Sequence, residues 1–183
     1  GALDRTVIFT YTESLFLQAE AASRGIINTT TAQAAYTAGI TASLDAAKVT
    51  PANQATYLAR TEVAWNAAWT PAQQIENIIT QKYISNFWVN MFESYNDYRR
   101  TGYPNPKKTG ANYDVNAEML SYYPGGIIRR QIPRLFPYPQ ADYDINKVNV
   151  QAAIDKQGVP FTTSEYPFDA RVFWDTAPLT IVY

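Results

Sequence analysis

The chain has 183 residues, a hydrophobic fraction of 46% and a formal net charge of −1, which is enough for one domain with a hydrophobic core. The absence of histidine and cysteine excludes Ser-His-Asp triads, cysteine nucleophiles, disulfides and the usual zinc sites. The small net charge argues against nucleic acid as a partner, and no apolar run approaches the ~18 residues of a membrane span. The 14 tyrosines and 4 tryptophans are typical of binding surfaces as well as of cores.

The first part of the chain predicts a helical hairpin. Val7 to Arg24 has helical periodicity, and Gly25 stands where a left-handed cap ends a helix. After a polar turn, a second, alanine-rich helix is predicted from Thr31 to Ala46. Its apolar row falls on Tyr36, Ile40 and Leu44.

This hairpin resembles one tetratricopeptide unit. The residues that carry the resemblance are Leu17, Ala21, Gly25, Ala32, Tyr36 and Gly39. A single unit cannot bury its own face, so neighbouring repeats are expected. No signal peptide opens the chain, since Leu3-Asp4-Arg5 leads directly into the helical pattern. We therefore expect the chain to be part of a longer protein.

Two Thr-Pro pairs predict the next helix starts. Thr50-Pro51 begins a short helix that reaches about Arg60, and Thr70-Pro71, with Gln73 completing a capping box, begins a longer one. The longer helix is expected to continue to about Arg99 and to stop before Gly102 and Pro104.

The stretch from Gln81 to Pro104 is crowded with aromatic residues. Its two i,i+4 rows are Tyr83, Phe87, Met91 and Tyr95, and Ile84, Trp88 and Phe92. Adjacent rows cover a wide arc of a helix, so this stretch is predicted to be a buried axle of the domain. Arg99 and Arg100 suit the helix C-terminus, where they favour the macrodipole; the alternatives are an acidic sugar or pairing with Asp97 or Glu93.

The composition changes from Gly102 onward, since nine of the 11 prolines and five of the 8 glycines lie between Gly102 and Tyr183. We expect ordered loops, one short helix from Asn146 to Lys156, and short strands at Phe173-Trp174 and Leu179 to Val182. The predicted fold class is mainly α: a helical hairpin (1–48), a second helical part with the long buried helix (49–101), and a loop-rich region with few short strands (102–183).

Four motifs in order suggest a family. They are the Tyr11–Ala22 helix followed by Arg24-Gly25; the Gln81–Tyr95 helix closing on Tyr98-Arg99-Arg100-Thr101-Gly102-Tyr103-Pro104; Ile132-Pro133-Arg134-Leu135-Phe136-Pro137-Tyr138-Pro139 with Asp142-Tyr143, Asn146 and Asn149-Val150; and Val172-Phe173-Trp174-Asp175. Together they resemble the C-terminal part of the SusD/RagB family, the surface glycan-binding lipoproteins of Bacteroidetes.

The resemblance implies a helical, tetratricopeptide-like binding protein, not an enzyme. It implies no cofactor, and location on the surface of the outer membrane through a lipid anchor that lies outside this chain. The implied partners are an oligosaccharide and a TonB-dependent, SusC-like transporter that receives it. The alternative is a helical scaffold that docks a protein partner without binding sugar itself.

Aromatic side chains are the candidates for sugar contact, because a planar ring stacks on the apolar face of a pyranose. The candidate residues are Trp65, Trp69, Tyr113, Tyr122, Tyr123 and Trp174. Tyr122 and Tyr123 stand out because they neighbour Gly125 and Gly126, which let backbone approach a ligand. Packing in a core or interface is the competing interpretation for each of them.

Other chemistries find little support. A glycosidase needs two carboxylates across a cleft, whereas Glu93 and Asp97 share a helix face and Asp142 and Asp144 are near neighbours. Asp142, Asp144 and Asn146 carry calcium-type oxygens but lack the glycine and distal glutamate of an EF-hand, so capping or turn formation is expected. The arginines at 129, 130 and 134 are interrupted by apolar residues, unlike a nucleic-acid footprint. No catalytic residue and no metal site is predicted.

Overall fold

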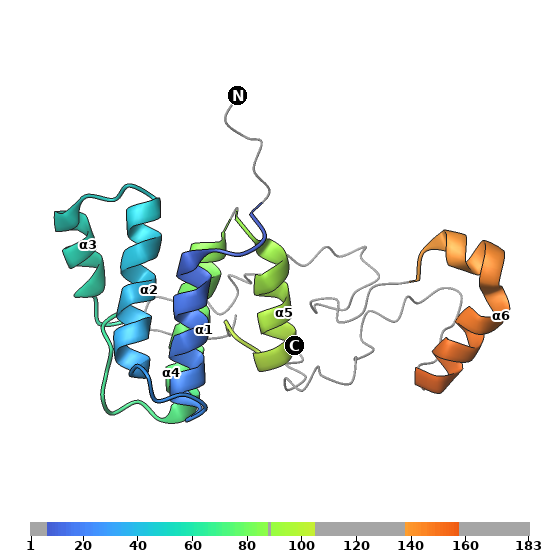
Figure 1. Ribbon diagram of the computed structural model, residues 1–183, viewed down its shortest axis with the longest axis horizontal. Helices are drawn as coiled ribbons and strands as arrows, with labels where there is room; N and C mark the ends of the chain where they lie inside the picture. The colour runs from blue at the N-terminus through green and yellow to red at the C-terminus, as the bar shows by residue number, and fades with distance from the viewer. Residues whose placement is uncertain (1–6, 88, 105–137, 158–183) are drawn as a thin grey trace, which may run out of the picture. The chain divides into compact units, whose positions relative to one another are not determined.

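The computed structural model describes residues 7–87, 89–104 and 138–157, and these residues form helices without strands (Figure 1). They divide into two units, the first of which runs to Tyr98 and takes in 103–105. The first unit contains α1 (Tyr11–Ser23), α2 (Ala32–Ala46), α3 (Pro51–Leu58), α4 (Pro71–Asn86) and most of α5 (Met91–Thr101); the second contains α6 (Gln140–Gln157). The predicted mainly-α fold is confirmed. The strands expected at 173–174 and 179–182 lie outside the described residues.

The helix α1 begins later than predicted. Thr10 has an extended backbone, and its Oγ1 accepts a hydrogen bond from the backbone N of Glu13 at 2.9 Å. A threonine in this role satisfies a backbone donor that the first turn leaves without a partner. Residues 7–9 are therefore a non-helical lead-in, and the predicted start at Val7 is wrong.

The predicted end of α1 is confirmed. Gly25 has a φ of +70°, Gly25 N donates to Ala22 O at 3.0 Å, and Ile26 N donates to Ala21 O at 2.9 Å. This pair of bonds is the Schellman motif, in which a left-handed residue closes the last turn. The turn that follows leads into α2, whose N-cap is Thr31, as the sequence predicts.

The helix α2 ends with the same motif, but with lysine in the left-handed position. Lys48 has a φ of 57°, and Lys48 N and Val49 N donate to Asp45 O and Leu44 O, each at 2.9 Å. Replacing Lys48 with glycine is expected to raise the free energy of unfolding by about 0.5–1 kcal/mol, because glycine adopts this φ without strain. Urea denaturation followed by circular dichroism measures the change.

The matched control for this prediction is Gly25→Ala. No heavy atom lies within 4 Å of a Cβ built at Gly25, so any loss there comes from the φ of +70° and not from crowding. We expect Gly25→Ala to lower the free energy of unfolding by about 1 kcal/mol. A Lys48→Gly protein less stable than wild type would show that the lysine side chain matters more than its backbone conformation.

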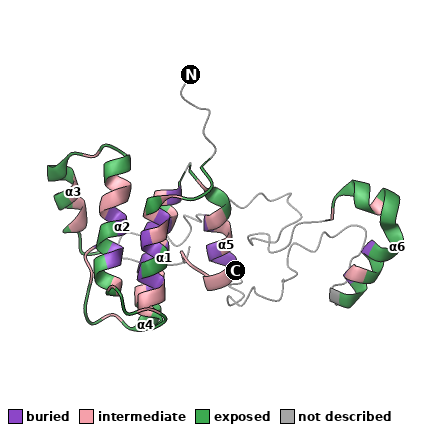
Figure 2. Ribbon diagram, viewed as in Figure 1, coloured by how far each residue is buried: buried purple, intermediate pink, exposed green. Residues whose placement is uncertain are grey.

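The core of the first unit lies where α1, α2 and α4 meet. Its fully buried residues are Phe16, Ala19, Ala35, Tyr36, Ile40, Val63 and Ile78. Gly39 lets α2 approach α1 closely, since a Cβ at this position would lie 3.0 Å from Cε1 of Phe16. Figure 2 shows buried positions on α1, α2 and α4, whereas α3 has none. The helix α3 is nevertheless tied to α4, because Tyr57 OH donates to Gln81 Oε1 at 2.9 Å.

Both predicted Thr-Pro starts are confirmed, but they differ in detail. At α4, Thr70 Oγ1 accepts from Gln73 N at 3.3 Å and Gln73 Oε1 accepts from Thr70 N at 2.9 Å, which completes the capping box. At α3, the Thr50 side chain makes no cap hydrogen bond, so proline at the first helical position is the main local signal.

The predicted single helix from Pro71 to Arg99 is wrong. It is broken after Asn86, where Phe87 leaves helical conformation with a ψ of 122°, and α5 starts at Met91. Asn90 Oδ1 accepts from Glu93 N at 3.4 Å, so the asparagine caps the new helix. The sequence signal was Asn90 three residues before Glu93, which is a capping pattern inside an apparently continuous helix.

The buried face of this region is also not the predicted one. Ile84 and Phe87 are each 50% exposed, Met91 is 46% exposed and Phe92 is 68% exposed. The buried positions of α4 are instead Ile75, Asn77, Ile78, Ile79, Gln81, Lys82 and Asn86. The sequence prediction placed the aromatic rows in the interior because they are the most apolar residues of this stretch. Packing against α1 instead buries the face of α4 that carries the isoleucines.

The end of α5 and the start of α6 test two further predictions. The helix α5 ends at Thr101 with Arg99 and Arg100 in its last turn, and Gly102 has a φ of +78°, so the predicted helix stop is confirmed. The helix α6 extends six residues before the predicted start, with a non-helical Asn146 at its kink. Of the helices in the described ranges, none is both long and apolar enough to cross a membrane.

Candidate functional site

The structure describes two of the six predicted sugar-contact residues. Tyr113, Tyr122, Tyr123 and Trp174 lie outside the described residues. Trp65 and Trp69 lie in the segment between α3 and α4, and both are partly buried.

Trp65 and Trp69 pack with Tyr36 in one aromatic cluster. The ring centroids of Trp65 and Trp69 are 5.3 Å apart, and those of Tyr36 and Trp65 are 5.4 Å apart, both in tilted or edge arrangements. Such edge contacts contribute beyond the area that the rings bury. The cluster therefore fastens the 63–69 segment to the hairpin, and it gives both tryptophans a packing role whether or not they also touch a ligand.

Tyr36 anchors this cluster. Its hydroxyl donates to Val63 O at 2.8 Å in the buried interior. Burial raises the pKa of Tyr36 above its ordinary value, and the nearby Tyr57 adds to the effect. The phenol consequently stays neutral and keeps its hydrogen bond throughout the pH range in which proteins are normally handled.

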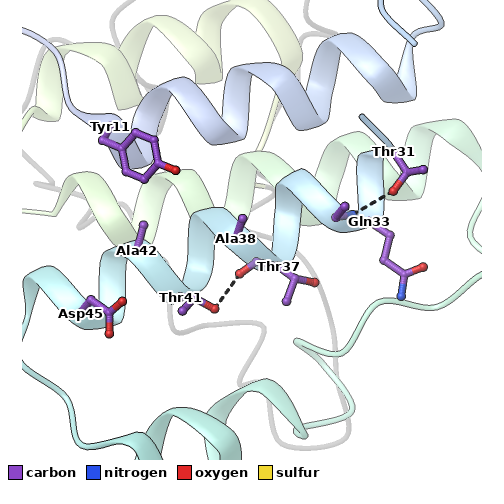
Figure 3. Close-up of a pocket in the computed structure, with 9 residues that line it drawn as sticks. Tyr11, Thr31, Gln33, Thr37, Ala38, Thr41, Ala42 and Asp45 are labelled. Carbon is purple, nitrogen blue, oxygen red and sulfur yellow. Dashed lines mark hydrogen bonds between the residues drawn. The ribbon is translucent and has the colours of Figure 1, made fainter. Parts of the chain in front are cut away.

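An open, shallow groove with a volume of about 680 Å³ runs along the exposed face of α2, and Tyr11 of α1 borders it near Ala42 (Figure 3). We call it the α1–α2 groove. Its base is formed by Ala34, Ala38 and Ala42 of α2, which follow one another at every fourth residue. Small side chains at this spacing leave a shallow, level channel along three turns.

Polar side chains form one edge of the α1–α2 groove. They are Thr31, Gln33, Thr37, Thr41 and Asp45. Thr41 Oγ1 donates to Thr37 O at 2.9 Å, and Asp45 Oδ1 accepts from Gln54 Nε2 at 2.7 Å, so these two side chains are oriented by the protein. Asp45 is the only charged residue among the nine that line the groove.

Tyr11 supplies the aromatic surface of the groove. It is the first residue of α1, and its side chain is among the most exposed large groups of the described residues, at 73%. Figure 3 shows the ring reaching from α1 toward Ala42 of α2. Sequence inspection missed it because the helix was predicted to start at Val7, which puts Tyr11 inside the helix, whereas α1 starts at Tyr11 after its N-cap Thr10.

A second polar group is buried beneath the hairpin. Lys82 Nζ lies 3.3 Å from Glu13 Oε1 and 2.9 Å from Asp97 Oδ2, with side-chain exposures of 2%, 2% and 7%. We call these residues the Lys82 triad. The triad joins α1, α4 and α5, and the sequence analysis did not detect Lys82. Asp97 is therefore held by a lysine, and not in an accessible pair with Glu93.

Buried polar side-chain atoms without a hydrogen-bond partner include Glu13 Oε2, Asn86 Nδ2 and Ser94 Oγ. Buried polar atoms of this kind are commonly satisfied by ordered water. They belong to the interior of the first unit.

The Asp142–Asn146 segment lies inside α6, with Asn146 at the kink. Gln140 Nε2 donates to Asp144 Oδ1 at 2.9 Å and Asn149 Nδ2 donates to Asn146 Oδ1 at 2.6 Å, both within α6. In the part of the chain that the structure describes, no three acidic, histidine or cysteine residues gather where they would hold a metal ion.

Comparison with known proteins gives a consistent result. A SusD-like family model, described as starch-binding and associating with the outer membrane, matches residues 3–124. A SusD-like protein of Bacteroidetes is 30% identical over 93% of this chain with a TM-score of 0.70, and a chitin-binding SusD homologue of Flavobacterium johnsoniae is 32% identical over 92% with a TM-score of 0.70. A SusD homologue of Bacteroides uniformis is 29% identical over 91%, with a TM-score of 0.67.

The chain spans only about a third of these solved structures: 30% of the first and 36% of each of the other two. No curated protein matches its sequence.

Proposed function

The chain belongs to the SusD-like family, whose model is described as starch-binding and associating with the outer membrane, and on this premise we propose that it takes part in glycan binding at the bacterial outer membrane. The observation that supports the proposal is the α1–α2 groove, which combines an exposed aromatic ring with hydroxyl, amide and carboxylate groups. That combination suits a sugar, which has apolar ring faces and polar edges.

The proposal includes the setting implied by the family resemblance. The protein binds oligosaccharide at the cell surface, is held there by a lipid anchor outside this chain, and passes the glycan to a TonB-dependent, SusC-like transporter. Chitin binding is recorded for the Flavobacterium johnsoniae homologue, which makes β-linked amino-sugar polymers one class to test beside starch.

We propose binding without turnover. Asp97 is buried and paired with Lys82, so the carboxylate pair Glu93 and Asp97 is not arranged across a cleft as glycoside hydrolysis requires. The predicted loop aromatics Tyr113, Tyr122, Tyr123 and Trp174, together with Trp65 and Trp69, remain proposed glycan contacts beside the groove.

Binding of a glycan panel to the whole chain tests the proposal. We expect isothermal calorimetry to detect at least one of the malto- and chito-oligosaccharides, with dissociation constants of about 10 μM to 1 mM, because a shallow site buries little ligand surface. The same mixtures, analysed by chromatography after long incubation, are expected to contain intact glycan. Absence of affinity across the panel would contradict glycan binding, and sustained cleavage would contradict a binding-only role.

A protein-docking scaffold is the second candidate, and one observation favours it. Large apolar side chains are exposed around the connection between α4 and α5 and on the lead-in to α1, notably Phe9, Phe87, Val89 and Phe92. The two segments are neighbours, since Asn90 Nδ2 donates to Ile8 O at 3.4 Å. Exposed apolar clusters commonly mark protein interfaces. Association with a co-expressed transporter by a chain that has no sugar affinity would favour this candidate.

A further inference from the structure

We propose that the α1–α2 groove is a subsite for uncharged oligosaccharides, with Tyr11 as its stacking surface and with anionic glycans excluded. The inference rests on the proposed function and adds to it a place, a contact residue and a class of sugar.

The position of Tyr11 is the first observation that supports a sugar subsite. An aromatic ring that stacks on a pyranose must present a face to solvent next to polar groups that reach the hydroxyls. Tyr11 is 73% exposed and projects over the alanine base at the end of the groove where Asp45 lies. The backbone of Tyr11 is held in place because Thr10, the preceding residue, caps the helix.

The alanine base of the groove is the second observation, because it leaves room for a ligand. Ala34, Ala38 and Ala42 add only methyl groups, so a ligand can lie along α2 without displacing a side chain. From Gln33 to Asp45 the helix rises about 18 Å at 1.5 Å per residue. A channel of this length fits a short linear oligosaccharide better than a single sugar.

The charge of the lining residues is the third observation, and it bears on the class of sugar. No lysine or arginine is among the nine residues that line the groove, and Asp45 adds one negative charge. A carboxylate or sulfate on a sugar would meet this charge without a cation to pair with it, which disfavours binding. Hydroxyl and acetamido groups can instead be bonded by Gln33, Thr37 and Asp45.

Calorimetry on the whole chain with three probes tests the proposal. The neutral probes are maltotetraose and N-acetylated chitotetraose, and the anionic probe is tetragalacturonate. We expect a neutral probe to bind and the anionic one to bind at least about tenfold more weakly. Tyr11→Ala is expected to weaken neutral binding by about three- to tenfold, and Tyr11→Phe to retain most of it, because the ring is what stacks.

Two further variants make the result specific to the groove. Ala38→Phe fills the base with a large side chain at an exposed position and is expected to reduce binding by more than about tenfold. Phe9→Ala is the matched control, because Phe9 is an exposed aromatic residue close to Tyr11 in sequence but is not part of the lining. It is expected to leave affinity unchanged, and melting temperatures report whether each variant is folded.

The outcomes separate the inference from the proposed function. If a neutral glycan binds with the same affinity to wild type, Tyr11→Ala and Ala38→Phe, the groove is not the subsite, although glycan binding stands. If tetragalacturonate binds as tightly as the neutral probes, the proposed class of sugar is wrong. If none of the probes and no member of the wider panel binds, the proposed function itself fails.

Discussion

Replacing Lys82 with alanine is expected to lower the free energy of unfolding by about 3–5 kcal/mol. Glu13 and Asp97 would remain in the interior without the cation that lies between them, at 3.3 and 2.9 Å in the native protein. Two buried carboxylates without this cation repel each other and lose their compensation for leaving water. Urea denaturation at neutral pH, followed by circular dichroism, measures the loss.

Two further variants define what this loss means. Lys82→Met keeps most of the aliphatic stem, so its destabilisation reports the charge and not the packing. Arg60→Ala removes an ion pair with Glu62, in which both side chains are more than half exposed, and is expected to cost less than about 1 kcal/mol. A Lys82→Met protein as stable as wild type would show that the triad is not needed to hold α1, α4 and α5 together.

The second large effect is expected from Phe16→Ala, which should lower the free energy of unfolding by about 3–5 kcal/mol. Phe16 is 1% exposed and belongs to the core shared by α1, α2 and α4. Removing its ring leaves a cavity that the two helices of the hairpin cannot close without moving. Leu17→Ala is the control, since Leu17 is the next residue of α1 but is 39% exposed, and it is expected to cost less than about 1 kcal/mol.

Gly39 offers an independent check of the same contact. A Cβ at Gly39 would lie 3.0 Å from Phe16 Cε1, so Gly39→Ala is crowded in the wild-type protein and relieved when Phe16 is alanine. The two substitutions are therefore expected to be non-additive by about 0.5 kcal/mol or more, with the double variant more stable than the sum predicts. Additive effects would mean that the Phe16 ring and α2 are not in close contact at Gly39.

The Lys82 triad also connects α5 to α4. The connection at 87–90 breaks the helix, and Asp97 then returns to the lysine that Glu13 already contacts. Arrangements of α1, α4 and α5 that separate these side chains are disfavoured, since they would leave a buried charge without its partner. The α1–α2 groove differs from the triad in its exposure, because its alanines and threonines remain at or near the surface of α2.

Local chemistry made much of the helical pattern predictable from the sequence. Gly25 ends α1, Thr70 with Gln73 begins α4, and Gly102 follows α5, because each of these signals acts through bonds to backbone groups within four residues. The family resemblance likewise came from ordered motifs in the chain, and the match over residues 3–124 supports it.

The sequence determined the mainly helical fold, several helix starts and ends, and the family, because these depend on residues that are close in the chain. Only the tertiary structure decided which face of α4 is buried, that Lys82 sits between Glu13 and Asp97, and that Tyr11 overlooks α2. Each of these depends on helices that are distant in sequence and on which side chains fill the space between them. Residue type alone pointed to the aromatic rows at 83–95, whereas packing against α1 selected isoleucines and one paired lysine.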